Sequence, residues 1–358
     1  MKIVNVRQRS PEWHAWRSQG LSASEAPVIM GRSPHKTLWR LWAERRGIVR
    51  PPDLSRNPNV RRGIANEDNA RSQFEATLGQ AVQEDLEEAD EETIVQARGD
   101  IEGVNNLFLL PACAESDDHP LMRASFDGLG DDGVPVEIKC PAPGTFEKVK
   151  LLREESEAYQ VYWCQVQHQI LVAGSAKGWL YFWSNGEAIP FEIQRDDAFL
   201  SALVARSMDF WAMLKSGKEP EKDLKRDIYI PEGTGLDAWN FLAVEYRLLY
   251  ERLAGQRAKA KAIEAQLDGI EAKMVGLMGH YAQGEAMGIR VNRYVQKGAV
   301  DYKAALKAQN PDIQEADLDQ FRRPDSDRVR VTLKGEDNAD VPFSLEDIQV
   351  ERDNDWVL

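Results

Sequence analysis

The chain has 358 residues, of which 42% are hydrophobic and 29% charged, with a formal net charge of −14; this balance is typical of a globular protein and excludes a disordered or membrane chain. No stretch approaches the roughly 20 apolar residues of a membrane helix, and the N-terminus has no apolar signal core, so a cytoplasmic location is expected. The three cysteines show no C-x-x-C spacing, which leaves buried free thiols as the expectation.

Charge is unevenly distributed along the chain. Residues 1–80 contain 14 Lys or Arg against 7 Asp or Glu, whereas residues 84–118 contain one Arg against 12 Asp or Glu. A segregated basic segment can bind DNA even in an acidic protein. Two solvated faces without a partner are the alternative, and this pattern alone does not separate them.

The N-terminal quarter predicts helices. Residues 11–48 are expected to form helix, turn and helix, with Ser10 as N-cap and a proline at the first helical position. Ser22 or Ser24 is expected to cap the second helix. After a proline-rich loop, Ala65 to Leu78 predicts a further helix that ends at Gly79.

From residue 122 the pattern changes to strands. Alternating side chains at 122–126 and 134–139, separated by a glycine-rich turn, predict a β-hairpin. A helix at about 159–172, a strand at 178–183 and a helix at 198–214 follow. This order predicts an α/β fold with a small mixed sheet flanked by helices, in a domain covering residues 1–220.

Residues 221–358 are expected to form a C-terminal extension. Its main feature is a stripe that alternates steps of four and three, apolar except at Gln256, at positions 242, 246, 249, 253, 256, 260, 263, 267, 270, 274 and 277. The stripe predicts a long heptad helix at about 238–280 that packs either on its own C-terminal segment or on another chain. Strand-like pieces at 288–295 and 329–333 around a helix at 302–309 predict a small α+β segment.

The candidate chemistry lies on the hairpin. Asp127 precedes Glu137-Ile138-Lys139 by ten residues. Because residues i and i+2 of a strand share a face, Glu137 and Lys139 point the same way, and the hairpin brings Asp127 beside Glu137. Converging carboxylates favour a hard divalent cation such as Mg²⁺, which makes a bound water more acidic, and the carbonyl of Ile138 is a further candidate ligand.

Lys139 is expected to orient the attacking water and to stabilise charge that grows in the transition state. The spacing is that of the PD-(D/E)xK nucleases. On its own the string is also compatible with a surface ion pair on an exposed strand.

Longer motifs narrow the interpretation. They are Trp13-His-Ala-Trp-Arg17, Leu21-Ser-Ala-Ser-Glu25, Gly63-Ile-Ala-Asn-Glu-Asp-Asn-Ala-Arg71, Ser125-Phe-Asp-Gly-Leu129, Val136-Glu-Ile-Lys-Cys-Pro141 and Gln165-Val-Gln167. In this order and spacing they resemble the YqaJ-like viral recombinase family of lambda-exonuclease-like enzymes, over about residues 1–215. The resemblance implies a PD-(D/E)xK nuclease core and a magnesium-dependent 5′→3′ exonuclease that acts on double-stranded DNA ends and leaves 3′ single strands for recombination.

The resemblance also implies roles for single residues. Glu67 would complete a two-metal site with Asp127 and Glu137, and Gln165 would be a catalytic-site glutamine. A solvated helix face for Glu67 and a buried helix contact for Gln165 are the alternatives. Tyr162 and Gln169 share the helix face of Gln165.

Arg17 would bind the 5′-terminal phosphate. Ser22, Ser24 and Ser125 would assist it, and Tyr162 is included among the DNA contacts; a surface arginine with capping serines is the alternative. One departure concerns the family's cation after Lys-Cys-Pro: here Pro143-Gly144-Thr145 follows, and Lys148 is the next cation.

The implied setting is a phage or prophage protein in a bacterial host, with Mn²⁺ able to replace Mg²⁺. A single-strand annealing protein as partner and a homo-oligomer, a trimer by analogy, are also implied. Two other functions are compatible with the sequence: a structure-specific or nicking endonuclease on the same core, and a non-catalytic module that binds DNA ends or a partner. The tryptophans at 13, 16, 39 and 42 are expected to pack in the core rather than to stack on bases.

Overall fold

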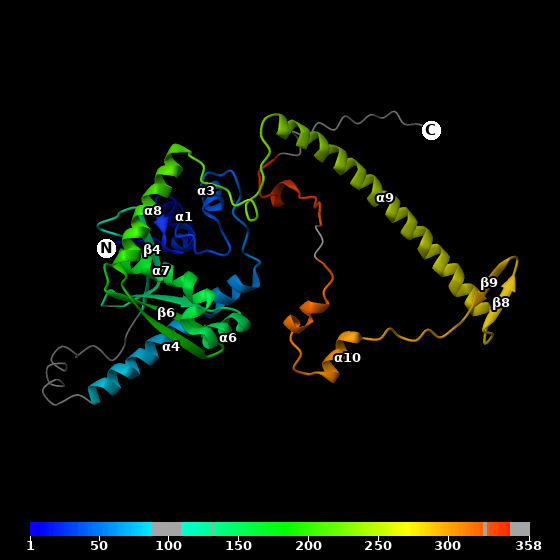
Figure 1. The fold of residues 1–358 in the computed structure, drawn as a ribbon, viewed down its shortest axis with the longest axis horizontal. Coiled ribbons are helices and arrows are strands. Elements are labelled where there is room, and N and C mark those ends of the chain that lie inside the picture. Colours follow the sequence, from blue (N-terminus) through cyan, green and yellow to red (C-terminus); the bar gives the residue numbers. More distant parts are fainter. Residues whose placement is uncertain (88–108, 131, 325–327, 344–358) are drawn as a thin grey trace. The chain divides into compact units, whose positions relative to one another are not determined.

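The computed structural model (Figure 1) describes residues 1–87, 109–130, 132–324 and 328–343. The chain divides into two compact units, Met1–Ile230 with Ala339–Pro342, and Pro231–Asn338 with Phe343–Leu358. Most of the acidic stretch noted in the sequence, residues 88–108, lies outside the described residues.

A mixed seven-stranded sheet organises the first unit, with helices on both faces. Its strands are β1 (Lys2–Val4), β2 (Leu21–Ser22), β3 (Leu110–Glu115), β4 (Met122–Leu129), β5 (Pro135–Lys139), β6 (Lys177–Ser184) and β7 (Glu187–Gln194). Its helices are α1 (Pro11–Ser18), α2 (Ala26–Ile29), α3 (Leu38–Arg45), α4 (Pro58–Glu87), α6 (Pro143–Leu152), α7 (Glu157–Ala173) and α8 (Asp197–Ser216), with short 3₁₀ turns η1 (Ala23–Glu25) and η2 (Arg153–Glu155).

The strand order is β1-β3-β4-β5-β6-β7, with β2 parallel to β4. Strands β5 and β6 are parallel, while β4 and β5 are antiparallel with Gly128 opposite Val136. The predicted hairpin and the mixed α/β architecture are therefore confirmed.

Side chains alternate along β5 and β6, so one face of the sheet packs on α7 and the other face packs on α4. On β6, Leu180 and Phe182 pack in the same cluster as residues of α7, whereas Tyr181 and Trp183 pack with residues of α4. On β5, Val136 and Ile138 join the α4 cluster. Successive side chains of a strand point to opposite faces of the sheet. Glu137 and Lys139, which alternate with Val136 and Ile138, therefore lie on the α7 face.

The first helix begins as the sequence predicted, whereas Ser22, expected to cap the second helix, caps the 3₁₀ turn η1 and the N-cap of α2 is Glu25. Ser10 is the N-cap of α1, and its hydroxyl accepts from the backbone N–H of Trp13 at 3.2 Å. Core packing of the tryptophans is confirmed, since all four are buried: Trp13, Trp16, Trp39 and Trp42. All three cysteines are buried free thiols, as expected.

One helix is longer than predicted. Helix α4 runs without a break from Pro58 through Gly79 to Glu87, so the predicted boundaries of 65 and 78 are wrong. A glycine in a helix interior costs about 1 kcal/mol relative to alanine, which good helix formers on either side can offset.

The second unit contains the long helix α9 (Thr234–Leu277), the hairpin of β8 (Gln283–Ala286) and β9 (Ile289–Asn292), helix α10 (Tyr302–Gln309) and 3₁₀ turns η3 (Glu315–Phe321) and η4 (Glu336–Asn338). The predicted heptad helix is confirmed, but none of its residues is buried by the described residues. Contacts between the helix and the described part of its own C-terminal segment include Arg247, which donates to the carbonyl of Lys334 at 3.3 Å and lies 5.6 Å from the ring centre of Phe343. The strand predicted at 329–333 is wrong, because that segment pairs with none of the described strands. None of the described helices has the length and apolar character needed to cross a membrane.

Candidate active site

The candidate site lies where β4 and β5 stop pairing. The ladder joins Gly128 to Val136 and Leu129 to Pro135. Beyond it, the backbone N–H of Ile138 donates to the Asp127 carboxylate at 3.0 Å instead of to a backbone carbonyl. The two strands therefore separate around Asp127, which opens a fork in the sheet.

Helix α7 fills this fork with polar side chains. Gln165 donates to Glu137 Oε1 at 2.6 Å and Gln169 donates to Glu137 Oε2 at 2.5 Å. His168 Nε2 lies 3.1 Å from the carbonyl of Arg123 on β4. Residues one turn apart on a helix share a face, so Gln165 and Gln169 hold both oxygens of one carboxylate.

Lys139 completes the hydrogen bonding of Glu137. Its ammonium donates to Glu137 Oε1 and lies 4.6 Å from the ring centre of Tyr162. Burial acts to lower the pKa of Lys139, but the charges of Glu137 and Asp127 outweigh it, so the pKa lies above its ordinary value. Lys139 is therefore a permanent cation rather than a general base.

Asp127 is electrostatically strained. Burial raises its pKa to about 8, and the negative charge of Glu137 contributes in the same direction, while Lys139 opposes the change. Only Oδ2 of Asp127 accepts a hydrogen bond from the described residues. A cation beside Asp127 and Glu137 would relieve this repulsion.

Glu67 lies within electrostatic reach of Asp127 but has partners of its own. Its carboxylate pairs with Arg71 at 3.0 Å and with Arg9 at 2.8 Å. Arg71 also donates to the backbone carbonyl of Asp127 at 3.0 Å, which ties α4 to β4. The structure thus brings Asp127, Glu137 and Lys139 together and holds Glu67 beside them on two arginines.

The donor set fits a hard cation. Asp127 Oδ1 and the one acceptor direction left on Glu137 are carboxylate oxygens, the ligand type that Mg²⁺ prefers. Among the described residues, no group of three or more His, Cys, Asp and Glu is arranged to hold a metal. The fit therefore rests on two carboxylates, with the backbone at Ile138 adjacent.

A second polar cluster surrounds Arg17. Its guanidinium donates to the hydroxyls of Ser22 at 2.7 Å and Ser24 at 2.9 Å, and it stacks 4.4 Å from the ring centre of Trp13. The negative charge of Glu25 acts to raise the pKa of Arg17, but the carboxylate of Glu25 forms its ion pair with Arg45, at 3.4 Å. Burial lowers the pKa of Arg17, yet a guanidinium stays charged at neutral pH. Among the described residues Arg17 thus has hydroxyl partners and no carboxylate in ion-pair contact.

Ser125 was expected to assist Arg17 in binding a phosphate, but its hydroxyl contacts other protein groups. Its hydroxyl accepts from Trp13 Nε1 at 2.8 Å and lies 3.5 Å from the thiol of Cys113. The hydroxyl is engaged inside the protein, and Ser125 does not line the cleft described next.

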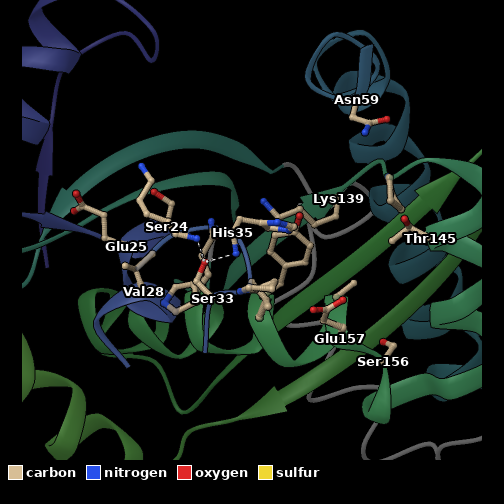
Figure 2. A pocket seen from close by; sticks show the side chains of 18 of the residues that line it. Ser24, Glu25, Val28, Ser33, His35, Asn59, Lys139, Thr145, Ser156 and Glu157 are labelled. Atoms are coloured by element: carbon tan, nitrogen blue, oxygen red, sulfur yellow. Dashed lines mark hydrogen bonds between the residues drawn. The ribbon is translucent and has the colours of Figure 1, made fainter. Parts of the chain in front are cut away.

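One cleft of about 1090 Å³ joins the two clusters. Arg17 and Ser24 line one part of it, and Lys139, Tyr162 and Gln165 line another. In Figure 2, Lys139 lies between Ser24 and Thr145. Lys148, the first cation after the Lys139-Cys140-Pro141 motif, also lines this cleft.

Sequence reasoning did not assign roles to three residues that shape the site. The sequence predicts Gln169 on the helix face of Gln165 without a function, and it includes Arg71 in a motif without a role. Nothing in the sequence marks Arg9. The four-residue spacing of Gln165 and Gln169 was the available signal. No comparable signal marked Arg9, because it is 58 residues from Glu67 in the chain.

Comparison with known proteins finds one matching family model and one relative by sequence. Residues 12–176 match the YqaJ-like viral recombinase domain. A Bacillus subtilis (strain 168) relative, "Uncharacterized protein YqaJ", is 23% identical over 330 residues, covering 87% of this chain and 91% of the relative.

Two solved structures are also similar. An alkaline exonuclease, LHK-Exo from Laribacter hongkongensis, is 20% identical with a TM-score of 0.42, covering 58% of this chain and 94% of that one. A phage-related exonuclease from Haemophilus somnus 129PT is 13% identical with a TM-score of 0.30, covering 55% and 96%. Residues 12–176 are therefore similar to the YqaJ-like viral recombinase domain, and the matched segment includes both Arg17 and Lys139.

Proposed function

We propose that this protein is a magnesium-dependent nuclease that degrades double-stranded DNA from its ends in the 5′→3′ direction, leaving 3′ single strands for phage-type recombination. The observation that carries the proposal is the single cleft that holds Arg17 in one part and Lys139 in another. A terminal phosphate and a phosphodiester of the same strand can then be bound together.

Arg17 supplies the preference for an end. A guanidinium that is partly desolvated and has no carboxylate in contact is suited to a dianionic phosphate, and the hydroxyl of Ser24, which lines the cleft, would be a further donor. The hydroxyls of Ser22 and Ser24 both accept from Arg17 and so orient its guanidinium. A terminal phosphate carries up to two negative charges whereas an internal phosphodiester carries one, so a guanidinium without a carboxylate partner favours the chain end. This charge difference supports the exonuclease over the endonuclease.

Asp127 and Glu137 would hold the divalent cation, with Mn²⁺ able to replace Mg²⁺. When bound, the cation would make water more acidic and offset the charge of the phosphate. Gln165 orients Glu137 through Oε1. Lys139, a cation directed to Glu137, is positioned to donate to a phosphate oxygen as negative charge grows on it.

The test uses two DNA substrates with magnesium: a 5′-phosphorylated linear duplex and a covalently closed circle. Mononucleotides from the linear duplex alone support the proposal. Nicked circles would support the endonuclease alternative, and DNA binding without any magnesium-dependent product would support a non-catalytic module. A homo-oligomer and a single-strand annealing partner stay predictions from the family resemblance.

A further inference from the structure

We propose that Gln169 is a positioning residue for Glu137 and thereby sets the affinity of the site for a divalent cation. The inference rests on the proposed function, because it concerns the cation that the nuclease would use. Gln169 is completely buried on α7 and is not among the residues that line the cleft.

The contacts of Gln169 span the fork in the sheet. Its Nε2 group donates to Glu137 Oε2 on β5 at 2.5 Å and makes a long contact of 3.5 Å with the carbonyl of Ser125 on β4. An amide NH₂ has two hydrogens and can serve both acceptors. Gln169 therefore links the two strands at the point where their own ladder has ended.

Counting acceptor sites shows what this link does to Glu137. A carboxylate has about four lone-pair directions. Lys139 and Gln165 occupy two on Oε1, and Gln169 occupies one on Oε2. The remaining direction is on Oε2, where Gln169 is the one hydrogen-bond donor among the described residues, so loss of Gln169 would leave the carboxylate held through Oε1 alone and free its second oxygen to shift.

The carbonyl end of the Gln169 amide makes an unfavourable contribution to the stability of the fold. Its Oε1 atom is buried and has no hydrogen-bond partner among the described residues. An unsatisfied buried acceptor costs about 1–3 kcal/mol. A methionine of similar shape would avoid that cost, so the contact with Glu137, rather than packing, explains the glutamine.

Gln167 provides a matched control on the same helix. It is equally buried, but its Nε2 donates to the carbonyl of Gln194 at 2.7 Å and its Oε1 accepts from the N–H of Asp196 at 3.0 Å. Both ends of its amide are satisfied by backbone at the end of β7. Gln167 therefore holds the fold and has no contact with Glu137.

The test compares Gln169→Met with Gln167→Met in the full chain. Binding of Mn²⁺ to the DNA-free protein is measured by the electron paramagnetic resonance signal of the free ion. Loss of a residue that orients a ligand typically weakens metal affinity about 10- to 100-fold, and this is the range expected for Gln169→Met. Gln167→Met is expected to lower the melting temperature and to leave the Mn²⁺ affinity within about twofold of wild type.

Cleavage assays give a second readout. For Gln169→Met, the Mn²⁺ concentration for half-maximal cleavage should rise while the KM for DNA is unchanged. Gln169→Asn, which keeps the amide but cannot span the same distance, should behave in the same way and carries the test if the methionine variant does not fold.

Wild-type Mn²⁺ affinity in Gln169→Met or Gln169→Asn, with wild-type cleavage, would overturn the inference and leave the proposed function intact. A wild-type protein that neither binds Mn²⁺ nor cleaves DNA would overturn the proposed function, and the inference with it.

Discussion

The Asp127 carboxylate accepts the backbone N–H of Ile138 at 3.0 Å, directly beyond the last backbone pair of β4 and β5. A side chain thus takes the place of a ladder carbonyl. Because the strands then diverge, space is available on the α7 face for Glu137, Lys139 and the two glutamines that hold Glu137. The position of Asp127 within the hairpin is therefore the origin of the site.

Removal of the Lys139 ammonium should lower the rate of DNA cleavage far more than the affinity for DNA. For Lys139→Ala, we expect kcat on linear duplex to fall about 100- to 1000-fold, the typical cost of losing one donor that stabilises transition-state charge. DNA affinity measured by fluorescence anisotropy in Ca²⁺ should be nearly unchanged. Lys150→Ala is the control, because Lys150 lies in an exposed ion pair with Glu187; equal activity of the two variants would contradict the role of Lys139.

Arg17 should determine the preference for 5′-phosphorylated ends. We expect Arg17→Lys to reduce the ratio of cleavage rates on 5′-phosphate and 5′-hydroxyl duplexes by about tenfold or more, since hydrogen bonds to charged groups contribute roughly 1.5–3 kcal/mol. The 5′-hydroxyl substrate is the internal control and should be cleaved at a similar rate by both proteins. An unchanged ratio would exclude Arg17 from end recognition.

Arg71 should stabilise the position of α4. It donates to the Asp127 carbonyl and pairs with Glu67, and its side chain is largely buried. We expect Arg71→Lys to lower the free energy of unfolding by about 1–3 kcal/mol, because the buried carbonyl loses its donor. Arg62→Lys, at a half-buried arginine whose hydrogen bond to Asn59 is exposed, should change stability by less than about 0.5 kcal/mol in the same urea titration.

The buried His168 should make stability depend on pH. Burial lowers its pKa to about 4, below the ordinary 6.5. The unfolded chain therefore binds a proton more readily, so the contribution of neutral His168 is complete above pH 6.5 and is lost as the pH falls towards 4. The shift corresponds to about 3 kcal/mol.

His168→Gln keeps a donor for the Arg123 carbonyl and removes the titration. Urea unfolding of both proteins between pH 7 and pH 4 should show a steeper loss for wild type. Parallel stability curves would contradict the assignment.

Patterns close together in the sequence predicted most of the core and of the site. The β4–β5 hairpin, helices α7 and α8 and the convergence of Asp127 with Glu137 all follow from alternation, caps and spacing within short segments. The contact of Glu67 with Arg9 could not be predicted in this way, because Arg9 is 58 residues away in the chain and has a left-handed backbone conformation, φ 69°.

Strands β1, β3 and β7 were also not predicted from the sequence. Strands β1 and β3 are short and pair with each other across more than 100 residues, and β7 contains a proline that argues against a strand by composition. Register between distant strands depends on tertiary packing, which no local pattern in a single sequence encodes.

The most direct test of the account is the location of Mn²⁺ in crystals of the full chain soaked with the ion and measured at the manganese absorption edge. The account predicts an anomalous peak in contact with the carboxylates of both Asp127 and Glu137. Ordered Asp127 and Glu137 side chains with no peak between them, or a peak only at another site, would contradict it.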